Sequence, residues 1–353
     1  MIIKKISSLA ASIISLLILQ LFFICNSNSQ DENSKYYSND NGVLSLMYHR
    51  FNENKYPSTN IRMNIFDQQM LIIKDLDYKF YNPKRFLNEF KNPKKEKKIL
   101  ITVDDGFKSF YTEAWPYLKK NKIPFILFVS TEPIGKKGYM NWDEIKEIEN
   151  SDLGYIGHHS HTHEYLIDMS YSEFVNDIET ATRIFNENLG YNPEIFSYPF
   201  GEYSKEMKDY ISKNFKIAFG QHSGVIDVNK DKYELPRFPI NEKYGNLKRF
   251  KSLIQYKPLE YKDLKPEEKK LEIIDNPPKV TVEFFSEQKN INNITCYSND
   301  GGSWKEPDMH FEKNFLHIKF KEKFLPRRGR INCSLNDNGQ WRWFGTQFTV
   351  IQN

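Results

Sequence analysis

The sequence predicts an α/β domain with parallel strands, either a barrel or an open sheet, followed by a small β-sandwich. Short apolar segments such as 43–49 alternate with segments of helical spacing such as 65–76, and this alternation is typical of βα units. A capping box at Ser170 and Glu173 begins a helix that should end at Gly190. Beyond a stretch rich in Lys, Glu and Pro, short alternating segments separated by turn residues indicate the sandwich.

The other elements follow from the same patterns in chain order. In the α/β domain, further strands are expected at 97–106, 125–130, 195–201 and 216–224. In the C-terminal part, strands are expected at 279–285, 293–298, 315–320, 329–335 and 344–350. The predicted divisions are an N-terminal export segment at 1–29, a polar tether at 30–41, the α/β domain at 42–250, a charged linker at 251–279 and the β domain at 280–353.

The N-terminus has the pattern of an export signal. Lys4 and Lys5 precede an apolar run at 6–24, and a polar segment follows it. Three fates stay open: cleavage after Ser29, lipidation of Cys25, or retention of the apolar run as a membrane anchor. Each fate places the body of the protein outside the cytoplasm, in the periplasm, at the cell envelope or secreted, and any membrane association would run through the N-terminus.

The charge balance of the chain limits which classes of partner it can have. The net charge is +4, and two of the positive charges, Lys4 and Lys5, lie in the segment expected to be removed. A nearly neutral chain argues against nucleic acid as the main partner, because phosphate binding leaves a concentrated basic footprint. We expect a monomer. In an oxidising compartment, Cys296 and Cys333 are candidates for a disulfide bond.

Polar residues follow several of the predicted strands, at the ends where chemistry collects in α/β folds. His49 follows the first strand, and Asp104 and Asp105 follow the next apolar strand. Two adjacent carboxylates crowd negative charge unless a cation lies between them. The alternative is that Asp105 caps the helix that begins near Lys108.

The segment 155–166 contains four of the eight histidines of the chain. His159 and His163 stand four positions apart, so on one helical turn both would face a single ion. Under that geometry His158 and His161 would point elsewhere. Two imidazoles and one carboxylate leave open positions on a divalent metal, as in catalytic sites. The alternative is a solvated polar loop that holds no metal.

Three ordered motifs, TVDDG at 102–106, HSHTH at 159–163 and SYPFG at 197–201, resemble those of the polysaccharide deacetylases. This is the NodB-homology group, carbohydrate esterase family 4. The resemblance extends over about residues 43–245 and implies a distorted (β/α) barrel. It is specific because the three motifs occur together and in the family's order.

The resemblance also implies a role for each motif. Asp104 would be the general base. The metal is usually zinc in the family, with nickel, cobalt or iron as alternatives, and its ligands here would be Asp105, His159 and His163. One wall of the substrate groove would be formed by Tyr198, Pro199 and Phe200. The backbone N–H of Phe200 would help to bind the oxyanion.

Two departures from the family pattern matter. Ser197 stands where the family commonly has an arginine that pairs with the catalytic Asp, and no Leu-x-Leu-x-His strand follows the third motif. His49 instead precedes all three motifs, an order that resembles the circularly permuted deacetylases that act on poly-β-1,6-N-acetylglucosamine. That resemblance implies His49 as the general acid, with His222 as a rival. Arg237 would replace the missing arginine.

The resemblance implies an exported, metal-dependent hydrolase that acts on carbon–nitrogen bonds other than peptide bonds. Its substrate would be an acetylated polysaccharide that contains N-acetylglucosamine, and its products would be acetate and a free amine on the sugar. Two alternatives keep the fold: an O-acetyl polysaccharide esterase, and a non-catalytic carbohydrate-binding protein. A metal-storage loop is a further alternative, but it leaves the adjacent aspartates unexplained.

The C-terminal part contains several aromatic residues with two open interpretations. They are Trp304, Trp341, Trp343 and Phe344. Trp341 and Trp343 share one face if they lie on a strand. Such rings either stack on sugars or cover a core or the neighbouring domain.

Overall fold

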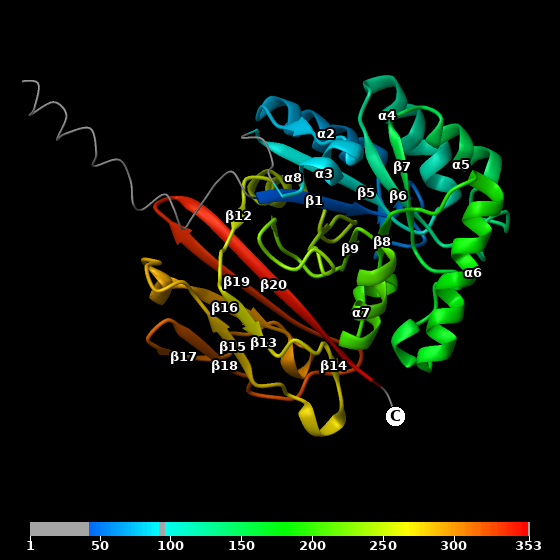
Figure 1. Cartoon of the computed structure of the whole chain (residues 1–353). Helices are drawn as coiled ribbons and strands as arrows, with labels where there is room; N and C mark the ends of the chain where they lie inside the picture. The colour runs from blue at the N-terminus through cyan, green and yellow to red at the C-terminus, as the bar shows by residue number, and fades with distance from the viewer. Residues whose placement is uncertain (1–41, 92–95, 352–353) are drawn as a thin grey trace, which may run out of the picture. The chain divides into compact units, whose positions relative to one another are not determined.

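The main sheet consists of short strands with nearly continuous apolar sequences in the computed structural model, which describes residues 42–91 and 96–351 (Figure 1). The strands follow the order β10-β1-β5-β6-β7-β8-β9, with β11 beside β1 and β4 beside β5. Their bounds are β1 (Gly42–Tyr48), β4 (Lys79–Phe80), β5 (Lys98–Val103), β6 (Phe125–Val129), β7 (Gly154–His158), β8 (Ile195–Ser197), β9 (Ile217–Phe219), β10 (Ile226–Asp227) and β11 (Phe238–Pro239). Every ladder is parallel except that between β1 and β10. The sheet is therefore of the parallel α/β type that the alternating pattern predicts.

Both faces of this sheet are buried, which explains why its strands are apolar without interruption. On β5, Ile99 and Ile101 face one core cluster, and Leu100 faces another. Helices cover the first cluster, to which Phe66 of α2 and Leu118 of α4 contribute.

Of the seven α-helices in the described residues, five begin after an Asn or Ser whose side chain caps the first turn. Their bounds are α2 (Met63–Asp75), α3 (Pro83–Glu89), α4 (Trp115–Asn121), α5 (Trp142–Glu149), α6 (Tyr171–Leu189), α7 (Lys205–Asn214) and α8 (Leu247–Leu253). A π-helical turn, η2 (Phe110–Ala114), leads into α4. The predicted helix after Ser170 is confirmed, because the Ser170 and Glu173 side chains form the capping box and Gly190 ends α6 at φ 81°. Short 3-10 turns occur at η3 (Leu166–Asp168), η4 (Pro199–Gly201), η5 (Ile273–Asp275), η6 (Ile291–Asn293) and η7 (Asp300–Gly302).

Two further sheets follow the α/β part, and a small two-stranded sheet joins β2 (Arg50–Phe51) to β3 (Asn60–Ile61). One C-terminal sheet has the order β12-β20-β19-β16 with β14 beside β20, and the other has the order β13-β15-β18-β17. Their bounds are β12 (Lys257–Pro258), β13 (Asp263–Lys265), β14 (Lys270–Leu271), β15 (Val280–Glu283), β16 (Thr295–Ser298), β17 (Asp308–Glu312), β18 (Phe315–Lys319), β19 (Arg328–Asp337) and β20 (Gln340–Val350). All five strands predicted in this part are present. The disulfide bond between Cys296 and Cys333 joins β16 to β19.

The prediction that residues 251–279 form a charged linker is wrong. It contributes β12 and β14 to one C-terminal sheet and β13 to the other. Lys269, in the middle of its charged run, is buried. These strands are two or three residues long, too short to show a period of two in the sequence. The described residues all belong to one compact unit, Asn39–Asn353.

The export segment and the tether, 1–41, lie outside the described residues. Within residues 42–91 and 96–351, no helix has the length and apolar character needed to cross a membrane.

Candidate active site

The functional side chains converge because parallel strands end at the same edge of the sheet. β1 pairs with β5, and β5, β6, β7 and β8 are consecutive neighbours. His49 follows β1, Asp104 and Asp105 follow β5, and His159 follows β7. Residues more than fifty positions apart in the chain are therefore brought to one place, as the sequence pattern predicts.

The ligand atoms of Asp105, His159 and His163 lie within 4.8 Å of one another. Oδ1 of Asp105 lies 3.0 Å from Nε2 of His163 and 3.3 Å from Nε2 of His159. Among the described residues, neither Asp105 Oδ1 nor His159 Nε2 has a hydrogen-bond partner, although both atoms are buried. Buried polar atoms without partners are rare, and a cation between them would satisfy both. These three residues therefore fit a divalent metal.

Two features prepare these ligands for a cation. Nδ1 of His159 lies 2.7 Å from the carbonyl oxygen of Ser197, so this nitrogen carries the proton and Nε2 is left with its lone pair toward Asp105. Burial opposes ionisation of Asp105, but the charge of His163 and the close approach of the two imidazoles hold the pKa of this carboxyl well below its usual range. The cluster thus presents an ionised carboxylate and an imidazole nitrogen with a free lone pair.

The expectation that His159 and His163 share a helical turn is wrong. Both lie in the loop between β7 and η3, where Ser160 has φ 69° and His163 has φ 57°. The carboxylate of Asp177 fixes the loop by accepting hydrogen bonds from the N–H groups of His161 and Thr162 at 2.7 and 3.0 Å. The i, i+4 spacing therefore brings the two imidazoles together through a folded loop.

The other two histidines of the segment have structural surroundings. His158 is buried, and its Nδ1 accepts a hydrogen bond from the Ser160 N–H at 3.1 Å. Burial lowers the pKa of His158 to about 3, so it is neutral. Nδ1 of His161 lies 2.8 Å from Oγ1 of Thr131, and this residue lines a separate surface pocket.

Asp104 is held by a fully buried arginine. Arg237 donates hydrogen bonds to both carboxylate oxygens of Asp104, at 2.7 and 2.8 Å. It also donates to Thr102 Oγ1, to Ser197 Oγ at 2.8 Å and to the carbonyl of Gly220. Burial raises the pKa of Asp104, but the charges of Arg237, His159 and His49 together outweigh this effect and leave the pKa below its usual value. Arg237 therefore pairs with Asp104, whose arginine partner is missing from position 197. Ser197, which occupies that position, contacts the same guanidinium.

His49 and His222 have different positions with respect to Asp104. Nε2 of His49 lies 4.0 Å from Oδ2 of Asp104, and His49 lines the same pocket as Asp105 and His163. Burial lowers the pKa of His49, while the two aspartates act in the opposite direction. His222 faces a different cavity together with Tyr203 and Glu234. The structure thus brings His49 to the site and turns His222 away from it.

The third motif contributes one side chain to the pocket. Phe200 lines it and has φ 59°, and its ring packs against His163 and Tyr165 with centroid distances of 4.8 and 4.3 Å. Tyr198 and Pro199, which were expected in the groove wall, are buried and do not line the pocket. The ring of Tyr198 packs instead against Phe196 and Tyr203.

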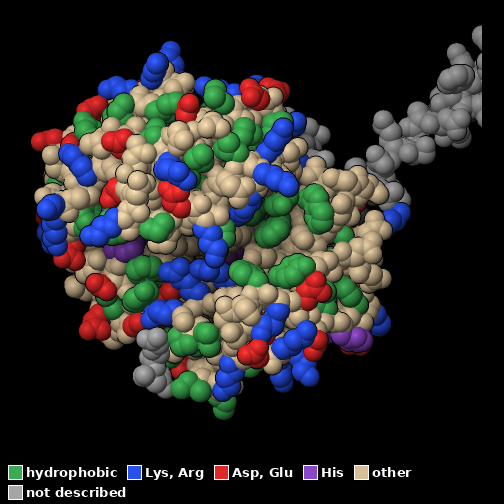
Figure 2. All heavy atoms as spheres, turned by 180° about the vertical axis from the view of Figure 1, so that it is seen from behind, with side chains coloured by type: hydrophobic (Ala, Val, Ile, Leu, Met, Phe, Trp, Pro, Cys, Tyr) green, Lys and Arg blue, Asp and Glu red, His purple; other side chains and the backbone are tan. Residues whose placement is uncertain are grey.

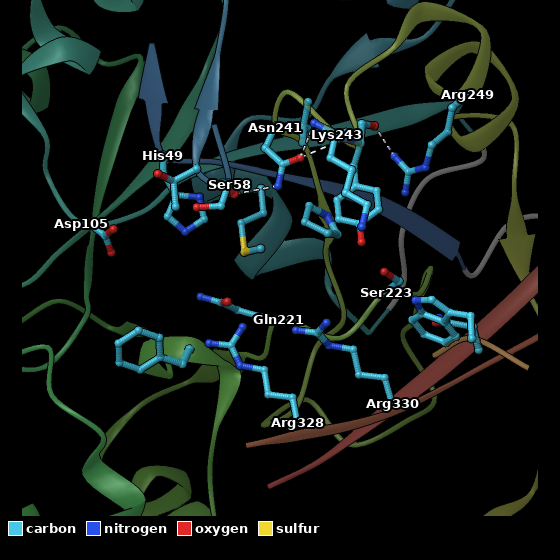
Figure 3. A pocket seen from close by; sticks show the side chains of 18 of the residues that line it. His49, Ser58, Asp105, Gln221, Ser223, Asn241, Lys243, Arg249, Arg328 and Arg330 are labelled. Carbon is cyan, nitrogen blue, oxygen red and sulfur yellow. Dashed lines mark hydrogen bonds between the residues drawn. The ribbon is translucent and has the colours of Figure 1, made fainter. Parts of the chain in front are cut away.

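A pocket of about 630 Å³ is lined by His49, Asp105, His163 and Phe200 of this site, and Figure 3 shows side chains that line it. Part of the lining comes from the C-terminal part of the chain. Trp304 and Trp343 were candidates to stack on sugars, whereas Arg328, Arg330 and Asn332 were not predicted from the sequence. The available signal was the alternation along β19, which places Arg328, Arg330 and Asn332 on one face.

The aromatic residues of the C-terminal part divide between the two interpretations. Trp343 stacks on Tyr256 at 5.4 Å, and its Nε1 donates to the Ser223 carbonyl at 3.3 Å, so it covers the α/β part. The ring of Phe344 is buried beside Tyr261. Trp304 and Trp341 are both about half exposed, and of these two only Trp304 lines the pocket.

The C-terminal sheets also hold the third-motif loop directly. Gln347 of β20 donates to the carbonyl oxygens of Phe200 and Gly201. The carboxylate of Glu202, which is almost fully buried, pairs with Arg327 at 2.6 Å and with Arg328 at 3.3 Å. The position of Phe200 therefore depends on contacts from both parts of the chain.

Comparison with known proteins agrees with this geometry. Residues 91–216 match the family model for polysaccharide deacetylase. The chain therefore carries a polysaccharide deacetylase domain, as the ordered motifs predicted.

The chain is also similar to individual proteins of this group. The chain is 25% identical over 245 residues to the poly-beta-1,6-N-acetyl-D-glucosamine N-deacetylase of Staphylococcus aureus, covering 61% of this chain and 84% of that protein. The structure of IcaB from Ammonifex degensii superposes with a TM-score of 0.55 at 25% identity, covering 61% of this chain and 97% of that one. The Streptococcus pyogenes deacetylase PplD has a TM-score of 0.53 at 22% identity, covering 57% of this chain and 94% of that chain, and supports the fold alone.

Proposed function

We propose that this protein hydrolyses N-acetyl groups of a polysaccharide that contains N-acetylglucosamine and releases acetate. One observation carries the proposal. Asp104, a carboxylate held by a buried arginine, lies beside three converging metal-ligand atoms, and two of the ligand residues, Asp105 and His163, line the pocket. The likeness to a poly-N-acetylglucosamine deacetylase supports the choice of substrate.

The proposed cofactor is a divalent metal held by Asp105, His159 and His163, with zinc as the first candidate and nickel, cobalt or iron as alternatives. When bound, such an ion supplies a Lewis acid beside the acetamide carbonyl and lowers the pKa of water toward neutrality. Two imidazoles and one carboxylate leave coordination positions open for this chemistry. His159 is already oriented as a ligand, because its Nδ1 donates a hydrogen bond to the Ser197 carbonyl.

The remaining steps belong to side chains of this chain. Asp104 takes the proton of the attacking water, since its pKa is held low and both its oxygens are fixed by Arg237. The Phe200 N–H donates a hydrogen bond to the acetamide oxygen as negative charge develops there. His49, 4.0 Å from Asp104, gives a proton to the departing sugar nitrogen; the two aspartates favour its protonated form against the burial that lowers its pKa. The C–N bond breaks, a C–O bond forms, and acetate leaves a free amine on the sugar.

Acetate release from a panel of N-acetylated and O-acetylated glycans tests this function. Wild type, Asp104→Asn and His49→Ala should be compared with and without a chelator. We expect release from N-acetylated glucosamine polymers to stop on chelation and to return with added metal. Release only from O-acetylated glycans would indicate the esterase alternative, and binding without any release would indicate a carbohydrate-binding protein. Full activity of His49→Ala would remove His49 from the mechanism.

We also propose that the protein is exported, to the periplasm or cell envelope, and that the two C-terminal sheets form a β-sandwich accessory domain. The export pattern of the N-terminus supports the first proposal. The disulfide bond between Cys296 and Cys333 also supports it, because such bonds persist in oxidising compartments. Fractionation of cells that produce the full chain, with detection by an antibody, tests the location.

A further inference from the structure

The pocket that contains the candidate active site has an unbalanced charge. Four cationic side chains line it: Lys243, Arg249, Arg328 and Arg330. Among the described residues that line it, the single carboxylate is Asp105, which the proposed metal would neutralise. On the face of the molecule that Figure 2 shows, lysine and arginine side chains gather beside a hollow near the centre. A neutral sugar chain would not need this excess of positive charge.

Three of these cations have no carboxylate partner in the part of the chain that the structure describes. Arg330 donates through Nε to the amide oxygen of Gln347, and Arg249 donates to the carbonyl oxygen of Tyr244. Lys243 forms no ion pair among the described residues. Arg328 pairs with Glu202, but that carboxylate is shared with Arg327.

Partly buried charges are normally paired, because leaving water costs free energy that a partner must offset. Arg330 departs from this rule: burial and, next, the charge of Arg328 lower its pKa to about 10. Burial also lowers the pKa of Arg249. An anion that entered the pocket would supply the missing partner for both guanidinium groups.

The cations stand on opposite walls of the pocket. Arg328 and Arg330 rise from β19 on one wall, while Lys243 and Arg249 lie across from them, as Figure 3 shows. His49 and Asp105 lie at one end of the same pocket. A saccharide that placed its acetamide at Asp105 would therefore run between the two cationic walls. The half-exposed ring of Trp304 lines this path and offers a face for a sugar.

We propose that the substrate is an anionic glycan in which a sugar near the reacting N-acetyl group bears an oxyanion, a carboxylate or a phosphate, that Arg330 and Arg249 bind. This inference rests on the proposed deacetylase function and adds a substrate class to it. Guanidinium forks match both oxyanions in geometry. The C-terminal sheets thereby supply specificity to a reaction that the α/β part carries out.

Matched oligosaccharides separate the two oxyanions. One pair is a tetrasaccharide that alternates N-acetylglucosamine with glucuronic acid and the same compound after reduction of its carboxylates to alcohols. The other pair is a β-1,6-linked N-acetylglucosamine tetramer with and without one 6-phosphate. The measured quantity is the ratio of kcat/KM for the charged and neutral member of each pair. The proteins are wild type, Arg330→Gln and Arg249→Gln, with Arg183→Gln on the exposed face of α6 as the control.

We expect wild type and Arg183→Gln to prefer one charged member by about 10- to 100-fold, the effect of a charge-assisted hydrogen bond. The ratio should fall toward unity in Arg330→Gln and Arg249→Gln. A preference in the first pair identifies the carboxylate, and one in the second identifies the phosphate. A ratio near unity in wild type, or one that survives both substitutions, overturns the proposal.

Binding of the same probes to Asp104→Asn, measured by calorimetry, separates this proposal from the proposed function. Tighter binding of a charged probe that is lost in Asp104→Asn with Arg330→Gln supports the anion site even if no probe releases acetate. Equal binding of charged and neutral probes overturns it even if acetate is released from both.

Discussion

Replacing Arg237 with Gln tests whether the buried ion pair with Asp104 organises the site. The guanidinium donates two charge-assisted hydrogen bonds to that carboxylate, at 2.7 and 2.8 Å, and both side chains are fully buried. Removing one partner of such a pair leaves an uncompensated buried charge, which costs about 3–5 kcal/mol. We expect the free energy of unfolding, measured by urea denaturation, to fall by about this amount.

Acetate release should fall in the same variant by about 100-fold, because a carboxylate without its fork loses its orientation toward the substrate. A double-mutant cycle with Asp104→Asn isolates the pair from general damage. We expect a coupling free energy of about 2–3 kcal/mol between the two positions. A coupling near zero, with both single variants folded, would refute the reasoning.

A change at Ser197 tests whether an arginine at that position can replace Arg237. Its Oγ lies 2.8 Å from the Arg237 guanidinium, so an arginine side chain at 197 could reach the same carboxylate. We expect Ser197→Arg combined with Arg237→Ser to recover part of the activity that Arg237→Gln loses. No recovery in a double variant that folds and binds metal would mean that the place of the arginine, and not only its charge, is required.

Three other changes have effects that follow from the contacts described. Glu202→Gln removes one of the two carboxylate partners of Arg327, the other being Asp168, and should lower the free energy of unfolding by about 2 kcal/mol in urea titrations; an unchanged midpoint would mean that the C-terminal sheets are held by other contacts. Burial lowers the pKa of His222 to about 4, so the unfolded chain binds a proton at this residue that the folded chain does not bind between about pH 6.5 and 4. The free energy of unfolding should therefore fall by up to about 3 kcal/mol as the pH is lowered through this range. His222→Gln should show a flatter pH dependence of unfolding, and an identical slope would contradict this. Replacing Cys296 and Cys333 by Ser together should lower stability by about 2–4 kcal/mol in thermal or urea unfolding, with reduced wild type as the control that should match it.

Elements and site residues could be predicted from the sequence where the pattern was local or was carried by a whole motif. The apolar strands end in the residues that form the site, and the capping box at Ser170 begins α6. The proximity of Arg237 to Asp104 was expected only from the missing arginine at Ser197. Strand order explains it, because the segment after Arg237 pairs with β1, which pairs with β5.

The rest depended on contacts between distant parts of the chain. The loop of His159 and His163 takes its form from Asp177 on α6, so spacing alone wrongly suggested a helical turn. The charged segment 251–279 forms strands because β20 and β15 offer free edges for pairing. Arg330 enters the pocket only because the C-terminal sheets pack beside the third motif.

The most direct test of the central claim measures metal content and acetate release on the same preparations of wild type and Asp105→Asn. Both proteins would be stripped with a chelator and then titrated with zinc, with an N-acetylated glucosamine polymer as substrate. We predict that acetate release by wild type rises in proportion to bound zinc up to one ion per chain, and that Asp105→Asn binds little zinc and releases little acetate. Undiminished release from metal-free wild type would contradict the account.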